Sequence, residues 1–375
     1  MKEIGYLLFA FFYYIFCLFC RRDSKKVFCV VTNNASEHGN VGMVVKELES
    51  RDADYKFHYY GKAERAQAGR IGKVFRFFLG HSRALASCGI ILQDNVFLPM
   101  AYLKFPPKVQ VIQLWHGTGT IKKFGQDVNT GRLGELEKKA NSRITRLIVN
   151  GPGMVKQYAG AFGIPEDRVV PLGLPMTDPL LKAEADTGMG KLEEEYPVLA
   201  GKKLLLYAPT FRDEEVEHPV WNLDTELLLG RLPAEWVLGI RLHPHVAERA
   251  EVPESERIIN LSLYPDLDKI LLGTAALVTD YSSIIFDYCA LRRPMYFYAY
   301  DLEQFSEQGR GFYKPYESFV PGPVVRTTKG LAEAVVSGSW DAEQGERFVN
   351  ENYQYLDGNA TERIVEMITK FENIS

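Results

Sequence analysis

Side chains that could do chemistry gather directly after four short apolar runs of this sequence. The motifs are WHGTG at 115–119, APTFRD at 208–213, RLHPH at 241–245 and DYSS at 280–283. Each run before a motif has the length and composition of a buried parallel strand. Because open α/β sheets bind ligands outside the carboxyl ends of their strands, the four motifs together predict one ligand site.

The residue types in the last three motifs favour a phosphate-bearing ligand. Thr210 supplies a hydroxyl and Arg241 a guanidinium, both common partners of phosphate. Ser282 and Ser283 stand at a predicted helix start, where backbone N–H groups are free to bind an anion. Asp287 follows one turn later on the same face of that helix. An ordinary serine cap explains the paired serines equally well.

His116 is the best candidate for a general base, because an unperturbed imidazole titrates near neutral pH. Gly117 and Gly119 beside it would let the backbone approach a ligand closely. A histidine that is only hydrogen-bonded in a turn is the alternative. His243 is a further candidate partner of the phosphates, although the proline after it favours extended backbone and leaves a purely conformational role open. His38, in an early polar loop, is a weaker candidate on the acceptor side.

Composition excludes several other classes of protein. The chain of 375 residues is 46% hydrophobic and 25% charged, which indicates a globular protein of about two domains. Its net charge of −4 provides no basic field for nucleic acid. Cys17 and Cys20 form a C-x-x-C without a second ligand pair for zinc, and the scattered cysteines fit a reducing compartment. The D-x-D patterns at 52–54 and 266–268 are better explained without a metal, so no metal site is predicted.

Apolar runs alternate with helical patterns through both halves of the chain. This alternation predicts two doubly wound, Rossmann-type α/β domains facing a central cleft. The proline-rich segment 171–179 is typical of an interdomain hinge. We therefore expect Rossmann-like domains at 27–175 and 176–343, followed by closing helices at 344–375.

The N-terminal segment 1–26 is the compositional outlier. Residues 4–20 are apolar and aromatic, and the basic cluster 21–26 follows them, which is the reverse of the order in a signal peptide. The pattern predicts a membrane-associated anchor helix with the rest of the chain on the cytoplasmic side. A buried helix of the folded core is the alternative. The basic, aromatic segment 62–83 indicates either a second membrane surface or a solvated helix face.

Taken in order, the motifs resemble those of the CDP-glycerol:poly(glycerophosphate) glycerophosphotransferase family of bacterial wall teichoic acid synthesis. The resemblance covers about residues 27–370. It is carried by WHGTGTIKKFG at 115–125, YAPTFRD at 207–213, RLHP at 241–244, TDYSSIIFD at 279–287, FYAYDL at 297–302, and RGFY with PGP at 310–323.

The resemblance implies catalytic roles for His116 and His243. It implies binding of substrate or nucleotide by a larger set: Trp115, Gly117, Thr118, Gly119, Pro209, Thr210, Arg241, Ser282, Ser283, Asp287 and Arg310. One departure concerns position 176, where Met176 stands in place of the basic residue that the family usually offers near the donor. Arg310 or Lys122 would then supply the missing charge.

The resemblance further implies a GT-B-like fold, with an acceptor domain at 27–175 and a CDP-donor domain at 176–343. The expected enzyme works at the cytoplasmic face of the bacterial membrane as a peripheral or monotopic protein. It would transfer glycerol phosphate from CDP-glycerol to an undecaprenyl-diphosphate-linked disaccharide, releasing CMP without a cofactor. The short region before the catalytic module favours a primase over a polymerase.

Three other functions stay open at this point. A ribitol-phosphate or capsule polymerase and a GT-B glycosyltransferase that uses a nucleotide sugar would have similar strand-end chemistry. A catalytically silent, membrane-bound binding module is the third, and the presence of both His116 and His243 argues against it.

Overall fold

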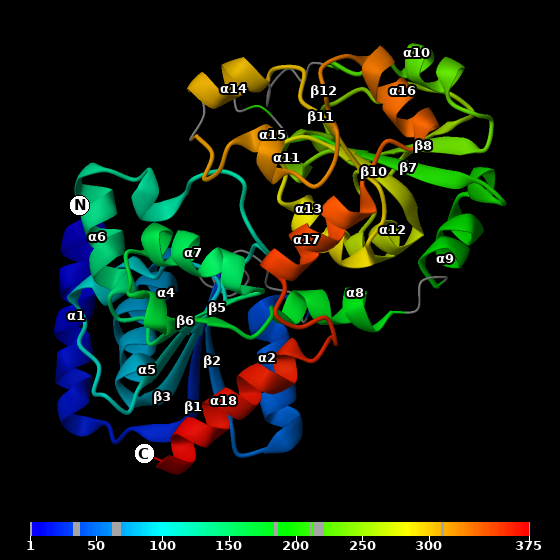
Figure 1. Cartoon of the computed structure of the whole chain (residues 1–375). Coiled ribbons are helices and arrows are strands. Elements are labelled where there is room, and N and C mark those ends of the chain that lie inside the picture. Colours follow the sequence, from blue (N-terminus) through cyan, green and yellow to red (C-terminus); the bar gives the residue numbers. More distant parts are fainter. Residues whose placement is uncertain are drawn as a thin grey trace. The chain divides into compact units, whose positions relative to one another are not determined.

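The computed structural model describes residues 2–32, 38–61, 69–183, 187–210, 212, 221–308 and 311–374. The chain forms two compact units, each built on one sheet (Figure 1). The first unit comprises Met1–Gly117, Phe124–Asp178 and Tyr353–Ser375, and the second comprises Thr118–Lys123 and Pro179–Asn352. The chain therefore passes from one unit to the other four times, and the closing segment 344–375 is divided between them.

The sheet of the first unit has six parallel strands in the order β2-β1-β3-β4-β5-β6. Their bounds are β1 Asp23–Val31, β2 Lys56–Gly61, β3 Cys88–Gln93, β4 Gln110–Gln113, β5 Arg146–Val149 and β6 Val169–Pro171. The order reverses between β1 and β3, which is the topological switch point of this sheet. Every residue of β3 is buried, as the continuous apolar run predicts for a central parallel strand.

Helices pack along the sheet of the first unit. They are α1 Lys2–Phe19, α2 Asn40–Arg51, α4 Arg70–Phe75, α5 Ser82–Ser87, α6 Gly131–Asn141, α7 Val155–Phe162 and α18 Ala360–Ile374, with a π-helical turn η1 at Arg76–His81. The last helix, α18, contributes Ile364, Val365 and Ile368 to the same buried cluster as Val27 of β1. The carboxylate of Asp178 accepts hydrogen bonds from the first backbone N–H groups of α18 and so fixes its start.

The expected N-terminal helix forms, but it is packed on the first unit rather than standing apart from it. Phe9, Ala10 and Tyr13 of α1 are buried, whereas Leu18 and Phe19 are 79% and 80% exposed. By length and composition, α1 is the one described helix that could cross a membrane.

Two residues of the basic cluster after α1, Arg22 and Lys25, are engaged within the first unit. β1 already begins at Asp23, and Lys25 forms ion pairs with Asp52 at 2.7 Å and Asp54 at 3.3 Å. Arg22 donates hydrogen bonds to the carbonyls of Leu85 and Cys88. These contacts also support the interpretation of the first D-x-D pattern without a metal.

The sheet of the second unit is also parallel and six-stranded, in the order β9-β8-β7-β10-β11-β12. The strands are β7 Lys203–Ala208, β8 Trp236–Ile240, β9 Ile258–Asn260, β10 Thr274–Thr279, β11 Met295–Tyr298 and β12 Val324–Val325. Counted from β7, this is the 3-2-1-4-5-6 order of a Rossmann sheet, with its switch point between β7 and β10. The prediction of two parallel α/β sheets is confirmed.

Helices and short turns connect the strands of the second unit. They include α9 Thr187–Glu195, α10 Thr225–Arg231, α11 Pro244–Ala247, α12 Leu267–Gly273, α13 Ile284–Tyr288, α14 Leu302–Gln308, α15 Tyr316–Phe319, α16 Thr328–Ser337 and α17 Ala342–Asn352. Asp266 caps α12 by accepting a hydrogen bond from the backbone N–H of Lys269. The second D-x-D pattern is therefore a helix cap, as the sequence favours.

Candidate active site

The switch point of the first unit is held by one aspartate, Asp94, which directly follows β3. Its carboxylate accepts a hydrogen bond from the backbone N–H of Thr32 at 2.9 Å, and its own N–H donates to the carbonyl of Val30 at 3.1 Å. Both partners belong to the end of β1. The next strand is tied to the same place, because the N–H of Leu114 donates to the carbonyl of Gln93. The loop that carries His116 therefore starts where the carboxyl-terminal ends of β1, β3 and β4 are held together by hydrogen bonds.

His116 is bound to this edge through its ring. Its Nδ1 lies 2.8 Å from the backbone carbonyl oxygen of Asp94. A carbonyl oxygen only accepts, so Nδ1 carries the proton and donates it, and Nε2 is left with a lone pair. Burial lowers the pKa of His116, against a smaller opposing effect of the Asp94 contact. The ring is consequently neutral near pH 7, in the tautomer that can accept a proton at Nε2.

Trp115 holds the imidazole from the other side. The two rings lie 3.9 Å apart between centroids, and the indole also contacts Phe124 and Phe162. The backbone of Trp115 has φ of 56°, a left-handed conformation that is rare for a bulky residue. Asn40 donates a hydrogen bond to its carbonyl at 3.1 Å and helps to hold it there. Strained backbone of this kind is typical of functional sites.

The second half of the WHGTG motif belongs to the second unit. Thr118 is buried and its hydroxyl hydrogen-bonds to the carboxyl group of Asp287 on α13. At Gly119, a Cβ atom would lie 2.5 Å from the ring of Phe286, also on α13. We expected Gly119 to leave room for a ligand, but the side chain that takes this room is Phe286.

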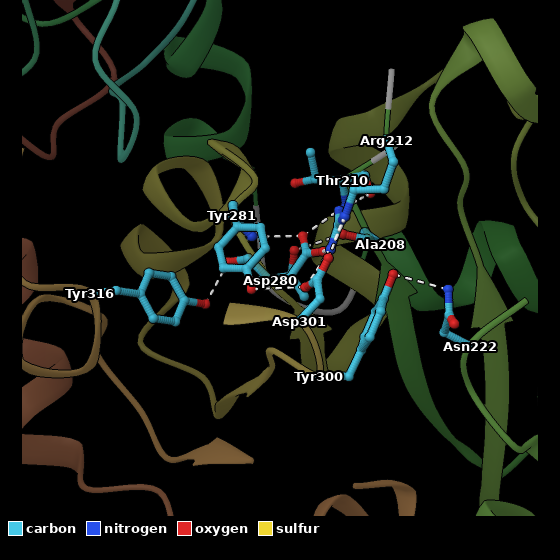
Figure 2. Close-up of polar contacts among 10 residues, drawn as sticks. Ala208, Thr210, Arg212, Asn222, Asp280, Tyr281, Tyr300, Asp301 and Tyr316 are labelled. Carbon is cyan, nitrogen blue, oxygen red and sulfur yellow. Dashed lines mark hydrogen bonds and ion pairs between the residues drawn. The ribbon is translucent and has the colours of Figure 1, made fainter. Parts of the chain in front are cut away.

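The switch point of the second unit brings together the ends of β7 and β10, and Figure 2 shows the contacts that join them. Asp280 follows β10, and its Oδ1 accepts hydrogen bonds from the backbone N–H groups of Thr210 at 2.7 Å and Tyr281 at 2.6 Å. The hydroxyl of Thr279 donates to the carbonyl of Ala208 at 2.6 Å. Two of the four predicted motifs, APTFRD and DYSS, are thus in direct contact.

An ion-pair network lies on the same strand ends, with Arg212 at its centre (Figure 2). Arg212 donates to both carboxylate oxygens of Asp301 at 2.8 and 2.9 Å, and to Asp280 at 3.1 Å. Burial would lower the pKa of this guanidinium, but the two carboxylates outweigh burial and raise it. Its face stacks 4.9 Å from the ring centroid of Phe305. The guanidinium is therefore fully engaged within the protein, where it also donates to the carbonyl of Thr210.

Sequence reasoning did not assign a role to Arg212, Asp280 or Asp301. Each of them is a charged residue of a strand-end motif: YAPTFRD, TDYSS and FYAYDL. A signal was therefore present, since one cation and two carboxylates that follow neighbouring strands can pair. The pairing itself joins residues 68 and 89 positions apart, which no local pattern reveals.

Thr210 is the predicted site residue with an unsatisfied polar atom. Its backbone N–H and carbonyl bond to Asp280 and Arg212, but its Oγ1 is buried without a hydrogen-bond partner among the described residues. A buried hydroxyl that lacks a partner costs free energy. An oxygen or nitrogen atom of a bound ligand would supply that partner. Pro209, beside it, is partly buried.

One of the paired serines, Ser282, forms a hydrogen bond within its own turn. The hydroxyl of Ser282 accepts a hydrogen bond from the backbone N–H of Ile284 at 3.3 Å, and Ser283 is exposed. The helix that they open, α13, is five residues long, so its dipole is small. Asp287 on this helix has a carboxyl group whose burial raises its pKa to about 7, while the Thr118 hydrogen bond acts in the opposite direction.

Arg241 and His243 follow β8 and are held differently. Nη1 of Arg241 donates to the carbonyls of Leu261 and Tyr264, and burial lowers its pKa. His243 is exposed, and its carbonyl accepts hydrogen bonds from the first turn of α11. Arg241 thus links β8 to the segment after β9, and the backbone of His243 starts α11. Their predicted roles at the phosphates would come in addition to these contacts.

The remaining predicted residues fall in different places. Met176 belongs to the first unit, where its side chain packs against the apolar core and its N–H donates to Asn40. A charged side chain would not suit that packing. Lys122 lies over the ring of Phe305 in the second unit, and Arg310 lies outside the described residues. Among the described residues, no group of three or more His, Cys, Asp or Glu side chains could hold a metal ion.

The strand-end geometry can now be compared with known proteins. The sequence model of the CDP-Glycerol:Poly(glycerophosphate) glycerophosphotransferase family matches residues 11–370. The chain belongs to this family. The match includes every motif discussed above, in both units.

Curated relatives of this glycerophosphotransferase-family chain are teichoic acid enzymes. A ribitol-phosphate primase of Bacillus spizizenii is 33% identical over 83% of this chain and 82% of its own. A poly(ribitol-phosphate) polymerase of the same organism is 30% identical over 98% of this chain, which spans only 60% of that polymerase. A glycerol-phosphate transferase of Staphylococcus aureus is 32% identical over 70% of this chain and 72% of its own.

Solved structures of other proteins share the fold of this chain. The wall teichoic acid polymerase TagF superposes with a TM-score of 0.76 at 22% identity, over 99% of this chain and 96% of the other. A UDP-GlcNAc 2-epimerase from Neisseria meningitidis superposes with a TM-score of 0.57 at 15% identity, over 92% of this chain.

Proposed function

We propose that this protein transfers glycerol phosphate from CDP-glycerol to a hydroxyl of an undecaprenyl-diphosphate-linked disaccharide, with release of CMP. Membership of the glycerophosphotransferase family supports the reaction class. The observation that carries the proposal is the fixed tautomer of His116, whose Nδ1 donates to Asp94 and whose Nε2 is ready to accept a proton.

In the proposed reaction, Nε2 of His116 takes the proton of the acceptor hydroxyl. The resulting alkoxide attacks the phosphorus that bears the glycerol. The bond from that phosphorus to the bridging oxygen breaks, and CMP leaves with the electron pair. In the second unit, His243, Arg241 and the helix start at Ser282 and Ser283 stabilise the charge on the phosphates and on the departing CMP. The other proposed contacts to the nucleotide are Pro209, Thr210, Asp287 and Arg310. No metal takes part in this scheme.

Thr210 is the best supported of the donor-binding residues. Its unsatisfied Oγ1 lies at the switch point of a Rossmann-ordered sheet, where ligands of such sheets bind. Arg212, Asp280 and Asp301 position this residue and do not themselves contact the donor. We therefore assign them a positioning role.

CDP-ribitol is a second candidate donor. It is favoured by the curated relatives, because four of those with 30–33% identity act in ribitol-phosphate transfer. For the number of units added, we propose priming, that is, the addition of a single unit. A ribitol-phosphate primase that is 33% identical over 83% of this chain supports this choice.

We further propose that the protein works at the cytoplasmic face of the membrane and contacts it through α1. The exposed face of this helix is apolar and aromatic, while its other face packs on the first unit. A helix with this division lies on a bilayer surface rather than across it.

An assay of CMP release with a panel of donors tests the function. CDP-glycerol, CDP-ribitol and a UDP-sugar would be offered with the lipid-linked disaccharide, and the product mass would be measured. CDP-glycerol turnover with a gain of one glycerol phosphate is the expected result. Turnover of CDP-ribitol alone would transfer the proposal to the second candidate, and turnover of the UDP-sugar alone would refute both.

A further inference from the structure

A cavity of about 690 Å³ lies in the first unit, away from the strand ends described above. It is bordered by Gln110 and Arg146, the first residues of β4 and β5, and by the last turns of α18. The strands of this sheet are all parallel. The cavity therefore lies at the amino-terminal ends of the strands, opposite to the carboxyl-terminal ends where His116 lies. It is therefore separate from the proposed active site.

The cavity is strongly basic. Fifteen residues line it, and none of them is acidic. Five are cationic: Lys104, Arg143, Arg146, Arg168 and Lys370. Among the described residues, only Lys370 of these five has an ion pair, with Glu366 at 3.4 Å. A concave surface lined by positive charges attracts an anion.

One of these cations has an unsatisfied buried donor. Nε of Arg143 is buried and has no hydrogen-bond partner among the described residues. Its neighbour Arg168 is instead fixed, because its Nη1 donates to the carbonyls of Ser142 and Ile144 at 3.1 and 3.0 Å. A buried guanidinium donor is stabilised by a charged acceptor such as a phosphate oxygen. The guanidinium of Arg168 is thus held in place by the protein, whereas the Nε–H donor of Arg143 is left for a ligand.

Most of the other lining residues are apolar, with Gln110, Ser142 and Thr145 as the polar exceptions. Phe105, Met367 and Phe371 line the cavity, and Phe371 is 37% exposed. A small inorganic anion would leave this apolar surface uncovered. A phosphate group that carries hydrocarbon would cover it, which favours an amphipathic ligand.

The cavity wall is joined to α1. The hydroxyl of Tyr13 donates to the carbonyl of Lys104 at 2.9 Å, and the rings of Tyr13 and Phe105 are in edge contact at 5.8 Å. Leu18 and Phe19, the most exposed apolar residues of α1, follow Tyr13 by about one and a half turns. The cavity and the proposed bilayer-contacting helix are therefore parts of one surface of the first unit.

We propose that this cavity binds the phosphate head group of an anionic phospholipid. The inference rests on the proposed membrane contact and is independent of the donor and of turnover. Arg143 and Arg146 bind the phosphate, and Phe105 and Phe371 contact the upper part of the lipid. Anionic head groups attract basic residues near a bilayer by roughly fivefold in affinity for each residue.

Vesicle flotation of the full-length protein tests the proposal. Vesicles of phosphatidylcholine with or without phosphatidylglycerol would be compared at physiological salt for the wild type, Arg143→Gln/Arg146→Gln and Lys46→Gln/Lys156→Gln. The control pair removes the same charge from the first unit outside the cavity. We expect the cavity variant to lose about tenfold or more of the binding to phosphatidylglycerol vesicles, and the control to stay within about twofold.

Equal losses in the two variants, or no loss in either, would overturn the proposal. Thermal shift with inorganic phosphate and glycerol 3-phosphate separates the two sources of phosphate. Submillimolar binding of either that vanishes in the cavity variant would assign the site to a soluble phosphate instead. If Arg143→Gln unfolds the protein, Lys104→Gln/Arg146→Gln takes its place. A protein that fails the donor assay but shows the expected flotation would refute only the proposed reaction.

Discussion

The imidazole of His116 donates its Nδ1 proton to the backbone carbonyl of Asp94 across 2.8 Å. The partner is main chain, so no side-chain substitution at position 94 removes the acceptor. The same aspartate uses its carboxylate to hold the end of β1. The tautomer of the proposed base is thus set by the sheet itself.

Replacing the proposed base should remove turnover without removing the fold. We expect His116→Ala to lower the rate of CMP release by about 10²- to 10⁴-fold. The affinity for CDP-glycerol, measured by calorimetry, should change little, because the proposed donor-binding residues are elsewhere. His58→Ala, on β2 and hydrogen-bonded to His81, is a histidine control outside the strand-end motifs that should retain activity. Equal loss in both variants would contradict the assignment.

The pH dependence of catalysis should follow the neutral form of His116. Burial lowers the pKa of this imidazole below its usual value near 6.5, so the basic form persists at pH 7 and is lost as the pH falls through the lowered pKa. The acid limb of kcat/KM should therefore have its midpoint below pH 6.5. In Trp115→Ala the ring is more exposed, and we expect that midpoint to move up toward 6.5. An acid limb above 7 in the wild type would contradict a buried neutral base.

Two threonines at the same switch point should respond in opposite ways. Thr210→Val removes a hydroxyl that no described residue satisfies, so stability should be unchanged or slightly higher. The KM for the donor should rise roughly threefold to tenfold, because one hydrogen bond to the ligand is lost. Thr279→Val instead removes a hydroxyl bonded to Ala208 and should cost about 1 kcal/mol of stability. Urea unfolding and donor titration of both variants check the contrast.

Asp280→Asn should destabilise the second unit. The substitution replaces a carboxylate that accepts from Thr210, Tyr281 and Arg212, and it leaves the buried guanidinium with less compensation. We expect a loss of about 3 kcal/mol in chemical unfolding. Glu235→Gln breaks the exposed ion pair with Lys203 and is a control that should change stability little. Comparable losses in the two variants would argue against a structural role for the Arg212 network.

Asp287 should make stability fall as the pH rises from about 4 to about 7. Its pKa is about 7 in the folded protein, against 3.8 for an ordinary aspartate, so in this interval the folded state holds a proton that the unfolded state has lost. Asp287→Asn removes this effect and should raise stability at pH 8 by up to about 4 kcal/mol. Unfolding curves at pH 4, 6 and 8 measure it. A wild-type stability that is flat over this range would show that the carboxyl group is not buried in solution.

Much of the scaffold could be predicted because parallel strands carry a strong local signal. The runs at 204–207 and 236–240 are continuously apolar, and they lie in β7 and β8. The strand-end rule then placed His116 and Thr210 at sheet edges, and both lie at switch points. These inferences need only short stretches of sequence.

What could not be predicted depends on contacts between distant segments. The pairing of Arg212 with Asp280 and Asp301, and of Lys25 with Asp52, joins residues far apart in the chain. Gly119 carries the signature of a ligand loop, yet it is small because Phe286 takes the space. Nothing in the local sequence tells these two reasons for a glycine apart.

The position of α18 has a consequence for how the protein is made. The core of the first unit, begun by β1, is completed by Ile364, Val365 and Ile368 from the last helix. On the ribosome, these side chains emerge after the whole of the second unit, so the earlier segments of the first unit expose an apolar surface until then. The main segment of the second unit runs continuously from Pro179 to Asn352. It has therefore been synthesised before Ile364 is added. The first unit, whose chain starts to emerge before that of the second, is therefore the unit that finishes folding later.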